Sequence, residues 1–331
     1  MIWQGERNAD GRLAWMYWPV VGTLVAGLLH AANAAVSVGL GFSMEYHREL
    51  ARLERGDTFI WIGTVGKFSQ PWKRLRERGV RRVYYQTEPF DLRRRWERCP
   101  FRNDSVDELF DFSWSNLERC SLVGPWAPRL RFVPPGDLGR RDPPGRAPTL
   151  KSKTMVFFGT LKDPYSRERL RTYKALKRAL GDRLQHTCKL TRHGPFPPKL
   201  PSVIVSVCLP VADEAWNDTA FAMLLQTHDI FVNLHKDKTA AKPVTFRNAL
   251  LLSENKLVIS ERAHARDEAE YDGMVIFSDD IIHDYHRLAD DARVATRTMQ
   301  LSSTRFRARF APAELFRRAG VYQDWALREL A

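Results

Sequence analysis

One segment near the C-terminal end constrains the fold of this chain more than any other. Within residues 229–261, the strand-like run DIFVNLHK is followed by the helical run FRNAL and by a second strand-like run, KLVISE. A strand, a helix and a strand in this order predict a parallel sheet, whose strands all end at one edge. The pattern places His235, Arg247 and Glu261 at that edge. Ligands of open α/β sheets bind there, so the segment marks the predicted site.

The same alternation of strands and helices extends over the rest of the chain. Alternation of this kind indicates parallel sheets with right-handed crossovers. We predict a glycine-bearing turn at residues 19–22. Strands are predicted over residues 12–18, 35–40, 58–62, 80–86, 108–112, 130–133, 154–158, 185–189, 203–207, 230–234, 257–260 and 274–277. Helices are predicted over residues 23–34, 42–55, 66–78, 114–120, 166–180, 217–227, 244–252 and 280–295.

A run rich in proline and glycine separates two such alternations. Residues 135–153 cannot hold regular structure with this composition and are predicted to be a linker. They follow an N-terminal domain over residues 1–134 and precede a second domain over residues 154–304. Residues 305–331 form an amphipathic stretch that we expect to return to the first domain. The predicted fold class is therefore α/β, with two Rossmann-like, doubly wound domains facing a cleft.

The charge of the chain favours an anionic partner. Its 331 residues carry a net charge of +13, which suits a nucleotide diphosphate, a nucleic acid or an acidic membrane surface. The excess is spread along the chain instead of being gathered in one run. We therefore disfavour nucleic acid and keep the anionic membrane surface as an alternative partner.

Two further features bear on the compartment. The four cysteines lie far apart without a C-x-x-C pair, which indicates neither a zinc site nor a disulfide framework and fits a reducing compartment. Residues 13–44 carry no formal charge, and a stretch of this length could span a membrane. Prolines and glycines interrupt it, which favours a globular domain. We predict a cytoplasmic protein, with membrane association or a single-pass anchor within residues 13–40 as alternatives.

Four short motifs resemble those of one enzyme family. They are YQTEPF at residues 85–90, DFSWSN at 111–116 with VPPG at 133–136, FFGT at 157–160 with Arg167 and Arg169, and NLH at 233–235 leading to Glu261. On these motifs the chain resembles glycosyltransferases of the B-type two-domain fold, and within them the spore-protein-like group of family-1-type transferases. The motifs are spread over about residues 84–277, which is more than half of the chain, whereas the first 80 residues are similar only in a general way.

The resemblance implies that the second domain holds a nucleotide sugar. Glycine lets the backbone approach the diphosphate, arginine neutralises it, and the amides at a helix N-terminus attract it. A carboxylate at the sheet edge accepts hydrogen bonds from ribose or sugar hydroxyls. The residues at the matching positions are Gly159, Thr160, Arg167, Arg169, His235, Lys236, Arg247, Asn248 and Glu261.

These residues also have purely structural interpretations. Gly159 can simply end a strand, and the arginines after it can belong to a solvated helix face. His235 can be a satisfied core histidine, and the helix that follows it can begin at the surface. Glu261 can form an ion pair with Arg262 or Arg266. The sequence leaves these alternatives open.

On the acceptor side, Glu88 and His30 are the candidates for a catalytic base, which an inverting transfer needs. Each also has a structural interpretation, Glu88 as the partner of nearby arginines and His30 as a satisfied helix histidine. The sequence has no D-x-D triplet, no phosphate-binding G-x-x-x-x-G-K-[ST] loop and no G-x-G-x-x-G fingerprint. These absences favour chemistry without a metal ion or a redox cofactor, and we predict neither a metal site nor a cofactor.

The leading hypothesis is a metal-independent glycosyltransferase that moves a sugar from a nucleotide-diphosphate donor to a glycan, lipid or protein acceptor. Arginines and helix N-termini stabilise the departing diphosphate in this hypothesis. The alternative is a catalytically degenerate member of the same fold that binds glycan, nucleotide or polyanion without turnover. Donor sugar, acceptor, stereochemistry and oligomeric state are left open by the sequence.

Overall fold

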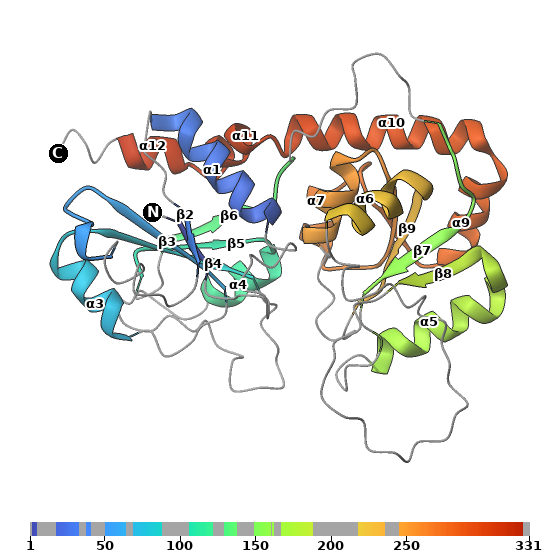
Figure 1. Ribbon diagram of the computed structural model, residues 1–331, viewed down its shortest axis with the longest axis horizontal. Helices are drawn as coiled ribbons and strands as arrows, with labels where there is room; N and C mark the ends of the chain where they lie inside the picture. Colours follow the sequence, from blue (N-terminus) through green and yellow to red (C-terminus); the bar gives the residue numbers. More distant parts are fainter. Residues whose placement is uncertain are drawn as a thin grey trace.

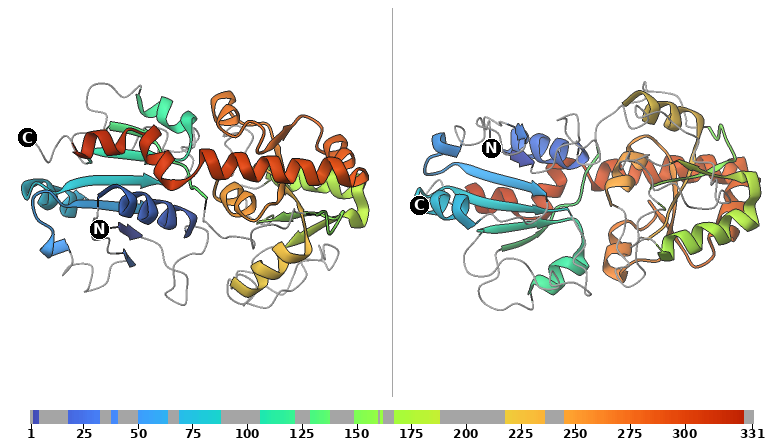
Figure 2. Two further views of the ribbon diagram at one scale, coloured as in Figure 1. Left: turned by 90° about the horizontal axis from the view of Figure 1, so that it is seen from above. Right: turned by 60° about the horizontal axis from the view of Figure 1, so that its bottom comes forward.

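The strands of the protein form two separate sheets, which lie beside each other along the long axis of the molecule (Figure 1, Figure 2). We call the six-stranded sheet with its helices the first lobe, and the five-stranded sheet with its helices the second lobe. The computed structural model describes residues 2–4, 18–32, 38–40, 50–63, 69–87, 106–121, 129–137, 149–159, 161, 167–187, 218–235 and 245–326.

The first lobe has a sheet of order β2-β1-β3-β4-β5-β6, and every pairing in it is parallel. Parallel strands need crossover connections, and helices lie between most of them. The elements are β1 (Ile2–Gln4), α1 (Trp18–Ala32), β2 (Val38–Leu40), β3 (Thr58–Gly63), α3 (Ser69–Glu77), β4 (Arg81–Gln86), β5 (Glu108–Asp111), α4 (Trp114–Ser121) and β6 (Arg129–Phe132).

The second lobe has a sheet of order β11-β10-β9-β7-β8, which is also parallel throughout. The elements that build it are β7 (Met155–Phe158), α5 (Arg167–Leu180), a 3-10 turn (Gly181–Arg183), β8 (Leu184–Thr187), α6 (Asp218–Thr227), β9 (Ile230–Asn233), α7 (Thr245–Ser253), β10 (Leu257–Glu261), α8 (Ala265–Glu270), β11 (Ile276–Ser278), α9 (Ile281–Asp290) and α10 (Ala292–Arg309).

Both faces of each sheet are buried. In β3, Trp61 joins an apolar cluster with residues of α3, whereas the next residue, Ile62, joins a cluster with residues of α1. In β7, Phe157 packs with residues of α5, and Phe158 packs with residues of α7. Successive side chains of a strand point to opposite faces, so a sheet covered on both sides needs continuous apolar runs. This requirement explains why the strands could be recognised in the sequence.

The C-terminal helices return to the first lobe. After α10 the chain forms α11 (Pro312–Arg318) and α12 (Val321–Ala326), and α11 packs on α1 (Figure 1). The contact is close, because a Cβ added at Gly27 would lie 2.9 Å from the ring of Phe316. Buried Arg131 bonds to Glu108 and, at 2.8 Å, to Asp324 of α12. Helices α11 and α12 are thereby built into the first lobe.

Several predicted boundaries are wrong. The turn predicted at residues 19–22 is part of α1, because proline fits the first turn of a helix. The helix predicted over residues 280–295 is two helices, since the Asp291 side chain caps α10 and ends α9. Helix α8 was not predicted. The first described strand is β1, whereas residues 12–17 and the strand predicted at residues 203–207 lie outside the described residues.

Two expectations about the compartment are also answered. In the described part of the chain, no helix combines the length and the apolarity needed to cross a membrane. The anchor considered within residues 13–40 contains the 15-residue helix α1, followed by the strand β2. Cys120 is fully buried and disulfide-bonded. The spacing of the cysteines, which indicated no disulfide framework, did not predict this bond.

Candidate functional site

The carboxyl edge of the second sheet brings together most of the predicted donor-site residues. Gly159 directly follows β7, His235 lies two residues after β9, and Glu261 ends β10. The first turns of α5 and α7 reach the same edge and carry Arg169 and Arg247. Residues that are separated by up to about a hundred positions are thus neighbours because parallel strands end together.

Two arginines pack against the same aromatic ring at this edge. The Arg247 guanidinium carbon lies 5.6 Å from the ring centroid of Phe157 and 5.0 Å from that of Phe158. The corresponding carbon of Arg169 lies 5.8 Å from the Phe157 centroid. Aromatic rings attract cations through their negative faces, so these rings orient both guanidinium groups.

Gly159 makes room for one of these guanidinium groups. A Cβ atom at this position would lie 2.5 Å from Nη2 of Arg247 and 3.1 Å from its Cζ. Real Cβ atoms do not approach other atoms that closely, so any larger residue would displace the guanidinium. The glycine does more than end a strand, because it allows Arg247 to lie against the backbone.

The electrostatics of the site favour an anion. Burial, and after it the charge of Arg169, lowers the pKa of Arg247 to about 9. The same two causes lower the pKa of His235 to about 4, so its ring is neutral at pH 7. Cations are normally held near carboxylates when they are buried. Within the described residues, no carboxylate pairs with Arg247, and an anionic ligand would supply the missing charge.

Buried polar atoms without partners gather at the same edge. Buried side-chain N and O atoms are nearly always hydrogen-bonded in proteins, so each exception calls for an explanation. Asn233 donates to Oδ1 of Asn248 at 2.7 Å, and the other polar atom of each amide has no partner within the described ranges. The atoms between residues 233 and 248 that have no partner among the described residues are Asn233 Oδ1, His235 Nε2, Thr245 Oγ1, Arg247 Nη1 and Asn248 Nδ2.

The carboxylate of Glu261 holds this edge together. One oxygen accepts the backbone N–H of His235 at 2.5 Å, and the other accepts the hydroxyl of Thr172 in α5 at 3.1 Å. The ion pairs considered for Glu261 are not formed. Arg262 pairs with Glu268 at 2.7 Å, and Arg266 pairs with Glu118 at 3.3 Å. Glu261 therefore ties the loop after β9 to α5.

The other predicted site residues are either exposed or only partly described by the structure, or they lie outside the described residues. Arg167 lies at the exposed start of α5. His30 belongs to the last turn of α1, a helix that contacts α7 of the second lobe, and its side chain is not described. Glu88, Thr160 and Lys236 lie outside the described residues.

Sequence reasoning missed two polar members of the site and one aromatic member. Asn233 and Thr245 carry polar atoms that have no partner among the described residues, and Phe157 contacts both arginines. A polar residue at the end of an apolar strand, as at Asn233, was the available signal. Nothing in the spacing marks Thr245 or Phe157, because their role depends on contacts made across the sheet edge.

The two lobes meet beside this edge in a largely polar junction. The fully buried Asp267 of α8 accepts hydrogen bonds from the Trp114 amide at 2.6 Å and from the Ser113 hydroxyl at 2.8 Å. It thereby caps the N-terminus of α4 from the other lobe. The rings of Phe112 and Phe246 meet edge to face, with centroids 5.6 Å apart. Phe246 immediately precedes Arg247, so the first lobe contacts the start of α7.

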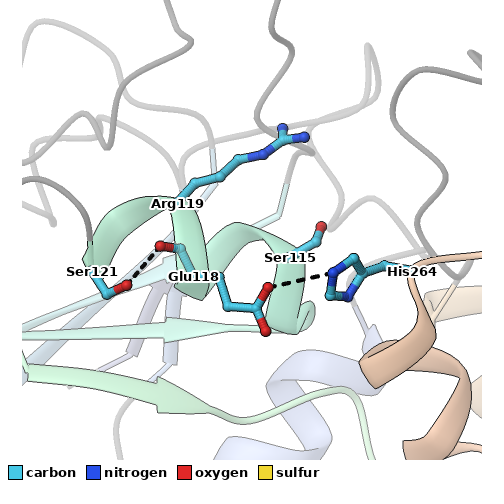
Figure 3. Close-up of a pocket in the computed structure, with 5 residues that line it drawn as sticks. All are labelled: Ser115, Glu118, Arg119, Ser121 and His264. Atoms are coloured by element: carbon cyan, nitrogen blue, oxygen red, sulfur yellow. Dashed lines mark hydrogen bonds and ion pairs between the residues drawn. The ribbon is translucent and has the colours of Figure 1, made fainter.

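A pocket of about 460 Å³ opens next to this junction (Figure 3). Its wall is formed by α4 and by His264, which precedes α8. In the pocket, Oε2 of Glu118 lies 3.4 Å from Nε2 of His264, and the backbone carbonyl of Glu118 accepts a hydrogen bond from the Ser121 hydroxyl. None of the predicted site residues lines this pocket, so it is distinct from the donor-side edge. Its lining residues are Ser115, Glu118, Arg119, Ser121 and His264.

Solved structures with a similar fold include glycosyltransferases. An alpha-glucosyltransferase in complex with UDP-glucose and DNA containing an abasic site matches with a TM-score of 0.59 and 12% identity, over 98% of each chain. A mutant of S. aureus TarM, solved with fondaparinux, alpha-GlcNAc-glycerol and UDP, matches with a TM-score of 0.51 and 11% identity. That match covers 83% of this chain and 57% of TarM. A GtfA/B complex matches with a TM-score of 0.46 and 10% identity, over 86% of this chain and 59% of that chain.

The architecture is therefore that of the B-type glycosyltransferase fold, with two Rossmann-like lobes on parallel sheets. The predicted fold class is confirmed. Neither a family model nor a curated protein sequence matches the chain. The narrower resemblance to the spore-protein-like group stays a prediction.

Proposed function

We propose that this protein is a glycosyltransferase that uses a nucleotide-diphosphate sugar as its donor and binds it at the carboxyl edge of the second sheet. The observation that supports this most is a group of five buried polar atoms between residues 233 and 248 that have no partner in the described part of the chain, together with the packing of Arg169 and Arg247 on Phe157. Phosphate oxygens accept several hydrogen bonds at once, and bidentate arginine suits them well.

The same residues can perform the chemistry that transfer needs. As the bond between sugar and diphosphate breaks, negative charge grows on the departing phosphate oxygens. Arg169, Arg247 and the amides at the start of α7 can stabilise that charge, as fixed dipoles and cations do in other enzymes. Metal independence is part of the proposal and rests on this positive charge. Glu88 and His30 remain the proposed candidates for a base on the acceptor side.

Donor binding can be tested by thermal stabilisation of the purified chain with UDP, GDP, ADP and their sugar conjugates, with and without EDTA. We expect one nucleotide series to raise the melting temperature, since a ligand at a hundred times its Kd adds about 2.7 kcal/mol. The double variant Arg247→Ala with Glu261→Ala should lose both the shift and the turnover. A control variant, Arg293→Gln with Arg297→Gln on α10, should keep both. Stabilisation by no nucleotide would refute the proposed donor.

The acceptor is the least constrained part of the proposal. Glycans, lipids and proteins belong in the acceptor panel, and DNA is added because one structural neighbour was solved with UDP-glucose and DNA. Transfer of radiolabelled sugar to one acceptor class would identify the substrate. Donor binding without transfer or donor hydrolysis would favour the alternative, a degenerate member of the fold that only binds. We also include in this proposal the spore-protein-like group, which rests on the sequence motifs alone.

A further inference from the structure

The exposed face of α5 carries a continuous row of positive charge. Arg167, Arg171, Lys174 and Arg178 are all exposed, and they follow one another at intervals of four, three and four residues. At 100° per residue these positions lie within about 60° of one another on the helix. We call these four residues the α5 stripe.

The opposite face of the same helix is built into the core of the second lobe. Arg169, Tyr173, Leu176 and Leu180 are buried and lie on the far side of the helix from the α5 stripe. The stripe therefore points straight into solvent and does not depend on the packing of the lobe. Its charges can be removed without disturbing the fold, because glutamine is also a good helix former.

Acidic residues do not neutralise the stripe. Of its four cations, only Arg171 pairs with a carboxylate among the described residues, that of Glu168 at 2.8 Å. A solvated helix face usually mixes both signs at intervals of three and four residues. Here all four positions along the arc are cationic. This departure, in a chain with a net charge of +13, indicates that the face serves an anionic partner.

The dimensions and the chemistry of the stripe select the partner. From Arg167 to Arg178 the helix rises by about 16 Å, which equals about five base-pair steps along the axis of a nucleic-acid duplex. A membrane surface fits less well, because interfacial helices insert apolar side chains. The exposed large hydrophobic residues in the described part are Met223 and Leu301, and neither lies on α5.

We infer that the α5 stripe is a binding surface for the phosphate backbone of a nucleic-acid duplex. The surface begins at Arg167, next to the donor-side edge, and extends away from it along the second lobe, on the side opposite α10 (Figure 1). This revises the expectation from the sequence, in which the positive charge looked too evenly spread for such a surface. The inference concerns binding alone and does not need the transfer reaction.

The test is fluorescence anisotropy with a 20-base-pair duplex DNA at several salt concentrations. The stripe variant is Arg171→Gln with Lys174→Gln and Arg178→Gln, which leaves Arg167 in place. Each phosphate contact contributes about 0.9 to the slope of log K against log salt, so we expect the slope to fall by roughly 2 to 3 and the Kd at low salt to rise at least about tenfold.

A matched control removes the same charge from the other side of the lobe. The variant Arg293→Gln with Arg297→Gln and Arg305→Gln on α10 should bind the duplex like the unmodified protein. Equal losses in both triple variants, or no loss in the stripe variant, would overturn the inference. Binding to phosphatidylserine vesicles without binding to the duplex would overturn it as well. Nucleotide-dependent thermal stabilisation, measured on the same stripe variant, reports the donor site separately.

Discussion

If Arg247 is held in place for an anionic ligand, its replacement by methionine should stabilise the free protein and at the same time destroy donor binding. Methionine keeps the length and the apolar part of the side chain and removes the charge. A structural arginine behaves in the opposite way, since its loss removes hydrogen bonds or ion pairs and lowers stability. In the described part of the chain, Nη1 of Arg247 has no hydrogen-bond partner to lose.

The size of the effect follows from the pKa of Arg247. Burial and the charge of Arg169 lower the pKa of Arg247 to about 9, and each unit below the ordinary pKa of arginine corresponds to about 1.36 kcal/mol. Keeping the charge in this place therefore costs at most about 5 kcal/mol. Arg247 is only half-buried, and solvent screening reduces this to about 2 kcal/mol. Subtracting about 1 kcal/mol for the lost contacts with Phe157 and Phe158 leaves a net stabilisation of about 1 kcal/mol.

The assay measures two quantities on the same protein. Differential scanning calorimetry without ligand should show a melting temperature about 2 °C higher in the Arg247→Met variant. Isothermal titration with the nucleotide diphosphate should show affinity weakened about 10- to 150-fold, as expected for losing charge-assisted hydrogen bonds. A variant that melts several degrees lower and binds the donor unchanged would show that Arg247 is a structural residue.

Three more predictions follow from single residues. Gly159→Ala should weaken donor binding at least about tenfold, because the new methyl group displaces the Arg247 guanidinium. In the control variant Gly181→Ala the new methyl group meets no atom within 4 Å, so this variant should change stability only. Lowering the pH from 6.5 to 4 should remove up to about 3 kcal/mol of stability through His235. The pKa of His235 is about 4 in the folded protein and higher in the unfolded chain, so in this pH range protons bind mainly to the unfolded chain and favour it. Asp267→Leu should cost about 2 to 4 kcal/mol and Asp267→Asn less, since asparagine can still accept the amide of α4.

Each of these predictions has a measurement that can contradict it. Titration calorimetry on both glycine variants separates a local effect on the donor from a general effect on the fold, and equal donor affinity in both would contradict the first. Urea unfolding at pH 7 and pH 4.5 should show a smaller pH effect in His235→Gln than in the unmodified protein. Equal pH effects in the two proteins would exclude His235 as the cause. For Asp267, urea midpoints of the two variants that coincide would show that the cap is not the important contact.

Much of the fold could be predicted because both sheets are parallel and buried on both faces. Their strands appear as apolar runs bounded by glycine, proline and charge, and the helices between them have an apolar stripe. The errors have local causes. The helix predicted over residues 280–295 ignores that Asp291 caps a second helix, and α8 has only six residues, which is too short for a periodic signal. The turn predicted at residues 19–22 gave too much weight to Pro19, which the first turn of α1 accommodates.

The candidate site was only partly predictable, for a different reason. The carboxyl ends of parallel strands meet by geometry, so His235, Arg247 and Glu261 could be placed at one edge before any contact was known. What each side chain does there depends on contacts that spacing does not encode. Glu261 binds the His235 amide and Thr172, and Arg247 lies on the backbone at Gly159. No periodic pattern predicts these pairs.

The junction between the lobes connects the donor-side edge to the first lobe. Asp267 caps α4, and Phe112, which lies between β5 and α4, contacts Phe246 at the start of α7. Burial raises the pKa of Asp267, and hydrogen bonds from Ser113 and from the α4 amides oppose this. A buried carboxylate that accepts hydrogen bonds from a helix end in the other lobe stabilises the protein most when the lobes are together. Its burial lowers the stability when those partners are removed. The approach of the first lobe therefore fixes the start of α7, the same turn that presents Arg247 to the donor. Removal of the Asp267 cap should consequently weaken donor binding as well as stability, although Asp267 is not among the residues at the donor-side edge.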